Sequence, residues 1–347
     1  MVSPIEEFMP IKATDREDGS VFLDTQFSLR DGERFVCLLD KAIPLVIDEY
    51  AADPTTRADA HLVEAEQARI WALPEARRHA AFLALSPILA SFARHTEKYP
   101  ALEMVYSHGD IRFDGLDGCD DGGTARRWFD GFENARAVRE RGTITTRLLV
   151  ESILERARRN QGSPVEVVSI ASGSARCVLD AVRQARALGI QVHARMFDLD
   201  GDALTYSRKL AAGMQLKGMI ETIQGNVVRD ISTKLGHVPA DVVEAVGIMD
   251  YLPDPVVLRY FLPQLYDLLK DGGRLIASNI KENREQSFLH DVIGWKDMIY
   301  RTSETFANLF VRPRVGFQPK NCRAHLTPDE LYCLVEAQKA TRPQAVI

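Results

Sequence analysis

The sequence contains no hydrophobic run of the length, about 20 residues, that a membrane-spanning helix needs. Its first segment, Met1–Asp18, has no apolar core behind a basic head, so we expect no secretory signal. An excess of basic charge is also absent, because the formal net charge is −6 and the isoelectric point is about 5.8. A mildly acidic chain has no electrostatic reason to follow a phosphate backbone. These absences predict a cytoplasmic protein that binds neither membranes nor nucleic acids.

Cysteine is sparse and forms no recognisable pattern. The five cysteines contain no CxxC pair, and none stands at zinc-site spacing from a histidine. They are Cys37, Cys119, Cys177, Cys322 and Cys333. We therefore expect free thiols in a reducing compartment.

A mainly helical region precedes residue 142. Apolar residues recur at helical spacing over Gly32–Asp53, His61–Trp71 and Glu75–Pro100, and Pro87 is expected to split or kink the third helix. The 347 residues are enough for two domains. We predict a helical cap domain over residues 1–141 and a second domain over residues 142–347.

Glycine and aspartate are concentrated between His108 and Phe132, which indicates turns. The sequence DGLDGCDDGG places four aspartates close together, and this clustering suggests a calcium loop. These aspartates are Asp114, Asp117, Asp120 and Asp121. The twelve-position pattern that ends in a bidentate glutamate is missing, so we expect a plain surface loop and no metal site.

Strands and helices alternate from Gly142 onward. Short β-branched runs predict buried strands, and the segments between them have helical patterns. The predicted strands are Val165–Ile170, Val192–Asp200, Met219–Asn226, Ala240–Gly247 and Arg274–Ile280. The predicted helices are Thr143–Asn160, Cys177–Gly189, Gly201–Met214 and Asp254–Gly273. Two further strands flank the turn Thr327–Asp329 and predict a hairpin. The alternation predicts an α/β fold with a mainly parallel sheet.

The turn after the first predicted strand consists of small residues around a single glycine, Gly173. Such a turn lets a ligand approach the backbone and a helix N-terminus, although small residues also serve tight packing. The second strand ends in Asp198 and Asp200, and an acid at this position can accept hydrogen bonds from both ribose hydroxyls. Asp202 is the expected cap of the helix that follows.

Residues 142–338 resemble the class I S-adenosylmethionine-dependent methyltransferases. In that family the first turn reads acidic-x-Gly-x-Gly-x-Gly, and the matching positions here are Ser169, Ala171, Gly173 and Ala175. The resemblance implies a Rossmann-like, doubly wound, mainly parallel sheet of seven strands with a C-terminal antiparallel hairpin. It also implies S-adenosylmethionine as the cofactor.

The resemblance assigns cofactor contacts to the turns after four strands. Asp198 matches the ribose-binding acid, Gly225-Asn226 matches the pair beside the adenine, and Ala245–Asp254 matches the loop that lines cofactor and acceptor. The implied cofactor-binding residues are Ala171, Ser172, Gly173, Ser174, Asp198, Leu199, Gly225, Asn226, Val246 and Gly247. Asp250 and Tyr251 are the residues on the fourth loop expected to contact the acceptor or the cofactor in catalysis.

A nicotinamide-dependent dehydrogenase is the alternative on fold grounds. Its first turn needs GxGxxG so that the backbone can touch a pyrophosphate. The sequence ASGSAR lacks the first and last of these glycines, and the C-terminal hairpin favours the methyltransferase.

A reactive sulfonium must be kept from water, and the short turns of the predicted sheet cannot cover it alone. We therefore expect the residues before Gly142 to cap the site, with Tyr106 among the catalytic residues that line it. Trp128, Phe129 and Phe132 either offer aromatic faces to a cation or pack in a core.

Two polar features near the end of the helical region have ordinary alternatives. His108 suits a general base, because its unperturbed pKa lies near neutrality, or it is simply solvated. The basic run Arg136–Gly142 either binds a carboxylate or forms a solvated helix face, and we favour the solvated face.

Three functions fit the resemblance. Methyl transfer to a small molecule in biosynthesis is the favoured one. The same scaffold carries nicotianamine synthases, which transfer the aminobutyrate arm of the cofactor, and azetidine-2-carboxylate synthases, which cyclise it; for a cyclase the cofactor itself is the substrate. Both release methylthioadenosine. The third function is a module that binds the cofactor without catalysis. The sequence leaves open whether the chain forms a homodimer.

Overall fold

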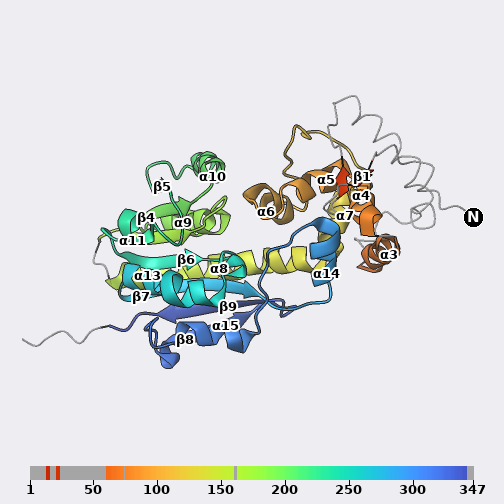
Figure 1. Ribbon diagram of the computed structural model, residues 1–347. Helices are drawn as coiled ribbons and strands as arrows, with labels where there is room; N and C mark the ends of the chain where they lie inside the picture. The colour runs from red at the N-terminus through yellow and green to blue at the C-terminus, as the bar shows by residue number, and fades with distance from the viewer. Residues whose placement is uncertain (1–12, 16–20, 24–59, 74, 160–161, 342–347) are drawn as a thin grey trace, which may run out of the picture. The chain divides into compact units, whose positions relative to one another are not determined.

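The computed structural model describes residues 13–15, 21–23, 60–73, 75–159 and 162–341 (Figure 1). They form two compact units. The first unit comprises the described part of residues 1–136 together with residues 284–296, and the second comprises residues 137–283 and those from 297 onward. The helix predicted over Gly32–Asp53 lies outside the described residues.

The first unit is mainly helical. A short antiparallel pair, β1 (Ala13–Asp15) and β2 (Val21–Leu23), precedes its helices. The helices are α3 (Ala60–Trp71), α4 (Glu75–Leu85), α5 (Pro87–Arg94), α6 (Tyr99–Tyr106), α7 (Thr124–Gly131) and α14 (Gln286–Phe288), and a π-helical turn, Leu289–Ile293, continues α14. Pro87 splits the third predicted helix, because it is the first residue of α5 and Ser86 is its N-cap.

Aromatic side chains fill the interior of the first unit. Trp128 stacks on Phe132 with 4.4 Å between ring centroids, and Phe129 meets Phe92 edge to face at 5.2 Å. All four rings are buried. Aromatic pairs of this kind contribute about 0.5–1.5 kcal/mol beyond their area burial. Of the two roles considered for Trp128, Phe129 and Phe132, the structure shows core packing.

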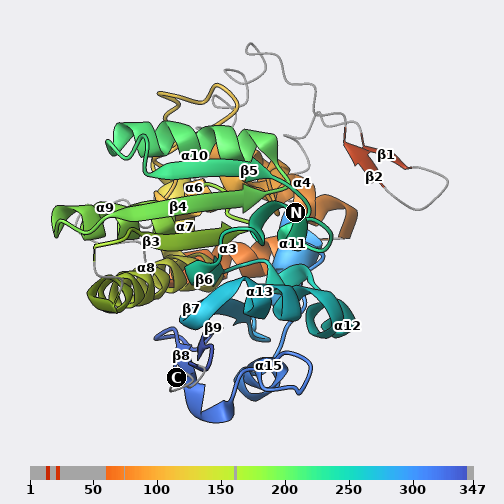
Figure 2. The same cartoon turned by 90° about the vertical axis from the view of Figure 1, so that its left-hand side faces the viewer.

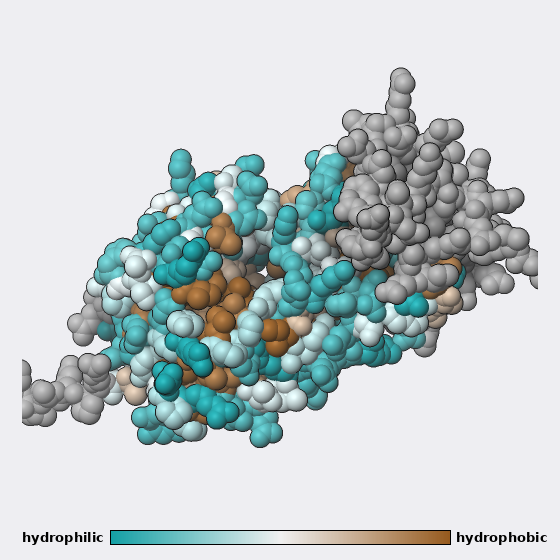
Figure 3. Space-filling model, viewed as in Figure 1, coloured by the Kyte–Doolittle hydropathy of each residue, from teal (hydrophilic) through white to brown (hydrophobic). Residues whose placement is uncertain are grey.

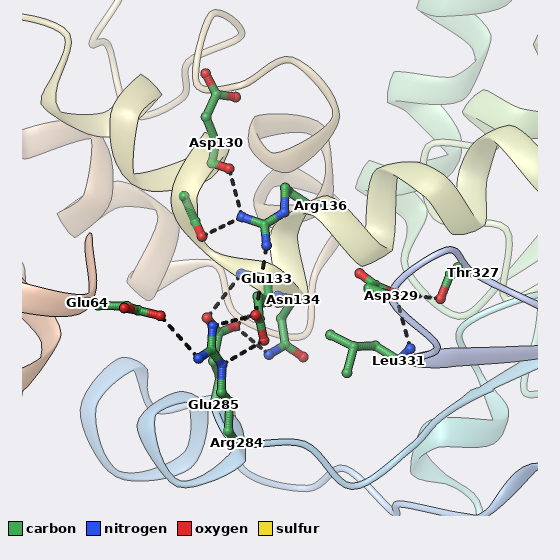
Figure 4. A network of polar contacts seen from close by, with 11 residues as sticks. Glu64, Asp130, Glu133, Asn134, Arg136, Arg284, Glu285, Thr327, Asp329 and Leu331 are labelled. Atoms are coloured by element: carbon green, nitrogen blue, oxygen red, sulfur yellow. Dashed lines mark hydrogen bonds and ion pairs between the residues drawn. The ribbon is translucent and has the colours of Figure 1, made fainter. Parts of the chain in front are cut away.

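Helix α8 (Glu133–Arg159) begins well before Thr143, where the sequence predicted its start. The Glu285 carboxylate accepts hydrogen bonds from the backbone N–H groups of Glu133 (3.0 Å) and Asn134 (2.9 Å) and from the Asn134 side chain (2.8 Å), as Figure 4 shows. Arg284 adds an ion pair with Glu133. The first N–H groups of a helix need acceptors. Here a residue more than 150 positions away supplies them, so the local sequence does not mark this helix start.

The second unit is built on a seven-stranded sheet with the order β5-β4-β3-β6-β7-β9-β8 (Figure 2). Its strands are β3 (Val165–Ile170), β4 (Val192–Asp198), β5 (Ile220–Gln224), β6 (Ala240–Ala245), β7 (Leu269–Ile280), β8 (Cys322–Leu326) and β9 (Tyr332–Gln338). The first five pair in parallel, and β9 is antiparallel to both of its neighbours. The predicted mainly parallel sheet with a closing hairpin is confirmed.

Helices cover both faces of this sheet, because alternate side chains of each strand point to opposite sides. Val165 and Val167 pack with one set of helices, and Val168 and Ile170 pack with the other. The first set is α8, α9 (Arg176–Ala187) and α10 (Gly201–Gly213); the second is α11 (Ile231–Leu235), α13 (Leu262–Leu268) and α15 (Ser303–Phe310). The remaining pieces are α12 (Asp254–Val256), a π-helical turn (Val257–Phe261) and two 3₁₀ turns (Met249–Tyr251 and Pro319–Asn321).

Some apolar residues of the second unit stay on its surface. Leu188, Leu199 and Tyr260 are exposed. Figure 3 shows apolar residues, in brown, among the polar ones on one face of this unit.

The sequence predicted that the double glycine Gly272-Gly273 ends the preceding helix. This prediction is wrong, because both glycines lie inside β7. Helix α13 stops earlier, at Leu268. The backbone explains the difference: Gly272 N donates to Lys339 O, and Lys339 N donates to Gly273 O. A side chain at Gly273 would lie 2.9 Å from the Lys270 carbonyl oxygen, so glycine is needed for close strand contact.

We expect Glu285→Ala to destabilise the first unit by about 1–3 kcal/mol, because three donors at the start of α8 lose their acceptor. Thermal unfolding followed by circular dichroism measures this as a lower melting temperature. Glu282→Ala, which removes an exposed carboxylate, is the control. Equal melting temperatures for the two variants would rule out the capping role.

Candidate functional site

The ends of the parallel strands in the second unit bring the predicted cofactor residues to one edge of the sheet. Strand β3 has β4 on one side and β6 on the other, so the strand order reverses beside it. Ligands of open α/β sheets bind at such a switch point, outside the carboxyl ends of the strands. All ten predicted cofactor residues lie at the ends of β3, β4 and β6 or just after β5: Ala171, Ser172, Gly173, Ser174, Asp198, Leu199, Gly225, Asn226, Val246 and Gly247.

The first turn, between β3 and α9, has an unusual backbone. Ala171, Gly173 and Ala175 all have positive φ angles, of 51°, 51° and 57°. Left-handed conformations of non-glycine residues cost free energy and cluster at ligand sites. The Ser172 side-chain oxygen is buried in this turn and has no hydrogen-bond partner among the described residues. A turn of small residues with such a hydroxyl suits close contact with a polar ligand.

Asp198 ties the first turn to the second. Its carboxylate accepts a hydrogen bond from Gly173 N at 2.7 Å and another from Asp200 N at 2.8 Å. Burial is the largest influence on this carboxyl and raises its pKa, although the two backbone N–H donors act in the opposite direction. The structure thus places a partly desolvated carboxylate at the end of β4, held by backbone N–H groups of the first and second turns.

The helix after β4 is capped by Asp200, so the expectation for Asp202 is wrong. The Asp200 carboxylate accepts from Asp202 N at 2.8 Å, and Asp200 is the N-cap of α10. Asp202 stands in the first turn of the helix, where a negative charge favours the helix dipole. Leu199, between Asp198 and Asp200, is 61 % exposed.

The third turn contains Gly225 and Asn226. A side chain at Gly225 would lie 2.5 Å from the ring of Phe197, so only glycine fits there. Gly225 N donates to the backbone oxygen of Asp198 at 2.9 Å. The Asn226 Oδ1 atom accepts from Val228 N at 2.9 Å and from Arg229 N. The side-chain oxygen of Asn226 is therefore engaged within the turn.

The fourth turn follows β6 and is anchored by a buried acid that the sequence analysis missed. Glu244 Oε1 accepts from Val246 N at 2.8 Å, and its Oε2 accepts from the Ser169 hydroxyl at 2.5 Å. Ser169 and Glu244 are register partners on adjacent parallel strands. Burial raises the pKa of Glu244 to about 7, against the effect of the Ser169 and Val246 hydrogen bonds. An acid inside a hydrophobic strand gives no motif, so the sequence offered no signal for it.

Asp250 lies in the interior of the second unit, 3 % exposed. It accepts from Ile280 N at 2.8 Å, and its second oxygen lies 3.7 Å from the Arg141 guanidinium. Burial raises the pKa of Asp250 to about 6, which Arg141 opposes. Tyr251, next in sequence, is half-buried.

We expected a solvated helix face over Arg136–Gly142, and this expectation is wrong for Arg141. Its side chain is buried, and its guanidinium lies 4.6 Å above the ring of Tyr332 as well as beside Asp250. An aromatic face and a carboxylate together compensate for the lost hydration of a cation.

Arg301 holds the loop that carries Asp250 and Tyr251. Its guanidinium donates to the backbone oxygens of Met249 (2.8 Å) and Leu252 (2.6 Å) and to Asp254 (2.9 Å). Arginine presents five donors in a fixed fork, so one side chain can fix several loop carbonyls. No local pattern indicates this role, because Arg301 follows the loop by almost fifty residues.

The candidate residues of the first unit are placed within that unit. Tyr106 ends α6 and is half-buried. His108 pairs with Asp130 through Nδ1. In the aspartate-rich loop, Asp114 accepts from Ser91, Arg94 and His95, and Asp121 caps the start of α7 by accepting from Ala125 N. Over the described residues, no group of three His, Cys, Asp or Glu side chains is placed to hold a metal ion.

The chain is similar to known proteins in sequence and in fold. Residues 125–281 match the model of a family described as "Putative methyltransferase". A "possible exported protein" from Bordetella parapertussis has a similar structure, with 19 % identity and a TM-score of 0.60 over 84 % of this chain and 100 % of that chain. An O-methyltransferase family protein from Burkholderia thailandensis aligns with 16 % identity and a TM-score of 0.48, over 90 % and 85 % of the two chains. None of the curated proteins matches the chain.

The sheet order and the closing hairpin define the fold, and the family match covers residues 125–281. The second unit has the Rossmann-like fold of class I S-adenosylmethionine-dependent methyltransferases, which confirms the resemblance stated from the sequence. S-adenosylmethionine is the cofactor that this assignment supports. No helix among the described residues is long and apolar enough to span a membrane.

We expect the stability contribution of Asp250 to fall as the pH rises. Its folded-state pKa, about 6, lies above the ordinary value of 3.8, so between these pH values the folded protein binds more protons than the unfolded chain. The free energy of unfolding of Asp250→Asn, measured relative to that of wild type, should therefore rise by on the order of 1–3 kcal/mol between pH 4.5 and pH 7.5. Urea unfolding at both pH values measures the difference.

The control for this experiment is Asp267→Asn, which removes an exposed carboxylate from α13. A stability difference between wild type and Asp250→Asn that stays constant over this pH range would show that Asp250 does not titrate as the geometry implies.

Proposed function

We propose that the protein transfers the methyl group of S-adenosylmethionine to a small-molecule acceptor. The observation that carries this proposal is the Asp198 carboxylate, which links the first and second turns at the switch point of a methyltransferase-type sheet. The family match over residues 125–281 supports the same reaction class. A role in small-molecule biosynthesis and a cytoplasmic location belong to this proposal.

The residues at the sheet edge fit the chemical groups of the cofactor. Asp198 offers a carboxylate for the two ribose hydroxyls, and exposed Leu199 offers an apolar surface for the adenine face. Asn226 Nδ2 suits the adenine edge. The first turn, with its buried Ser172 hydroxyl, suits the methionine arm. When bound, the sulfonium supplies an electrophilic methyl group whose carbon–sulfur bond breaks with the electron pair left on sulfur.

The protein's own part in such a transfer is to position the acceptor and exclude water. Asp250 and Tyr251 stay our candidates on the acceptor side. Because Asp250 is buried and bonded to Ile280 N, we assign it to orienting the loop, and half-buried Tyr251 to contacting the acceptor. The prediction that the helical N-terminal residues cap the site, with Tyr106 as a lining residue, stands unchanged as a proposal.

Incubation of the protein with S-adenosylmethionine and a set of candidate acceptors, followed by mass spectrometry of all products, tests the reaction. We expect S-adenosylhomocysteine together with an acceptor that is heavier by one methylene unit. Methylthioadenosine as the product, formed without an acceptor, would replace methyl transfer with aminobutyrate chemistry.

Asp198→Ala should weaken S-adenosylmethionine binding by roughly 10- to 100-fold, since hydrogen bonds to a charged group contribute about 1.5–3 kcal/mol. Isothermal titration calorimetry measures the affinity. The affinity of Asp198→Asn should lie between those of wild type and Asp198→Ala, because the amide oxygen still accepts from Gly173 N.

Asp202→Ala is the matched control, since its exposed carboxylate stands on the same helix start. Should Asp202→Ala weaken binding as much as Asp198→Ala does, the ribose contact does not belong to Asp198.

A further inference from the structure

The position that leads the first turn holds a serine, yet a carboxylate still occupies the space beside it. Ser169 stands where the methyltransferase family has an acidic residue, one place before the end of β3. Its register partner on the neighbouring strand β6 is Glu244. The Ser169 hydroxyl donates to Glu244 Oε2 at 2.5 Å. The acidic residue missing from β3 is therefore present on β6, one strand away.

Both oxygens of the Glu244 carboxylate accept hydrogen bonds near the ends of the strands. One accepts from Ser169, near the end of β3, and the other accepts from Val246 N at the fourth turn. The side chain is 6 % exposed. A carboxylate has about four acceptor sites, and these two donors use two of them. The remaining lone pairs can accept from a ligand donor that lies between the first and fourth turns.

A carboxylate that is buried for structural reasons alone normally has a close cation to pair with. Arg141, from α8, lowers the pKa of Glu244, but burial outweighs it and the pKa stays raised. The Arg141 guanidinium lies beside Asp250 and over the Tyr332 ring. A positively charged ligand group beside Glu244 would therefore offset the free-energy cost of burying its carboxylate.

We propose that Glu244 is the displaced acid of the first turn and binds the ammonium group of the methionine arm of the cofactor. This inference rests on the proposed function, because it needs S-adenosylmethionine at the sheet edge. Ser169 is then a positioning residue, which orients the Glu244 carboxylate toward the arm. The chemistry favours the ammonium group over the sulfonium, because an ammonium group brings N–H donors to the remaining lone pairs and a sulfonium has none.

Three ligands separate the possible contacts. S-adenosylmethionine has both the sulfonium and the ammonium, S-adenosylhomocysteine has only the ammonium, and methylthioadenosine has neither. Glu244→Gln should weaken binding of the first two by roughly tenfold or more, and that of methylthioadenosine by less than about twofold. Isothermal titration calorimetry on the full chain gives all three affinities. Glu304→Gln, which removes an exposed carboxylate from α15, is the matched control and should change none.

A rescue experiment distinguishes the charge from the local packing. The swapped variant Ser169→Asp/Glu244→Ser returns the acid to β3, and it should bind S-adenosylhomocysteine at least fivefold more tightly than Glu244→Ser alone. This variant also keeps a buried carboxylate at the same place, so it remains informative where Glu244→Gln does not fold.

Each result has one meaning. Equal weakening of all three ligands by Glu244→Gln, or no rescue by the swap, would overturn the inference and assign Glu244 to the structure of the two turns. Weakening of S-adenosylmethionine alone would place Glu244 at the sulfonium and also overturn it. Wild-type protein that binds none of the three ligands would overturn the proposed function itself.

Discussion

The parallel pairing of β3 with both of its neighbours is the constraint on which the candidate site depends. β3 is buried along almost its whole length and is paired with β4 through all six of its residues and with β6 through three. Because the register is fixed, the ends of these strands meet at one edge, and Asp198, Gly173 and Glu244 are brought together from distant parts of the chain. A slip of one residue would reverse every side chain of β3 and dismantle both hydrophobic layers.

Asp198 and Glu244 at this edge share one electrostatic condition with Asp250 in the interior of the second unit. Asp198, Glu244 and Asp250 all have pKa values raised by burial, even though each accepts a backbone N–H bond. Backbone donors orient a carboxylate but bring only partial charge, so they do not replace the lost hydration. An edge of this kind favours a ligand that carries positive charge and hydroxyl donors. S-adenosylmethionine has both, and its binding would favour the ionised forms of these acids.

The sequence was a good guide to the features that depend on neighbouring residues. The β-branched run Val165–Ile170 coincides with β3, and Pro87 divides two helices as expected. Asp198 is the last residue of its strand, close to the end that the sequence predicted. In each case the cause lies within a few residues of the element, in side-chain period, ring constraint or strand end.

The features that the sequence did not predict depend on partners far along the chain. The start of α8 is set by Glu285, and the burial of Arg141 depends on Asp250 and Tyr332. Asp200 takes the cap that we expected of Asp202, because a difference of two residues at a strand end is below what pattern reasoning resolves. The helix predicted through Gly273 ends earlier, because Gly272 and Gly273 form backbone hydrogen bonds with Lys339.

The comparison of Ser169 with Glu244 shows why a weakened motif need not mean a weakened site. A motif records which residue stands at each place along one strand, whereas a ligand is sensitive only to where charge and donors lie in space. Parallel strands in register present adjacent side chains about 5 Å apart, so an acid can move from one strand to the next with little change in its position. The hydroxyl left on β3 then fixes the acid on β6. Sequence reasoning along a single strand detects only the loss, and the structure shows an acid on the adjacent strand, bonded to the serine.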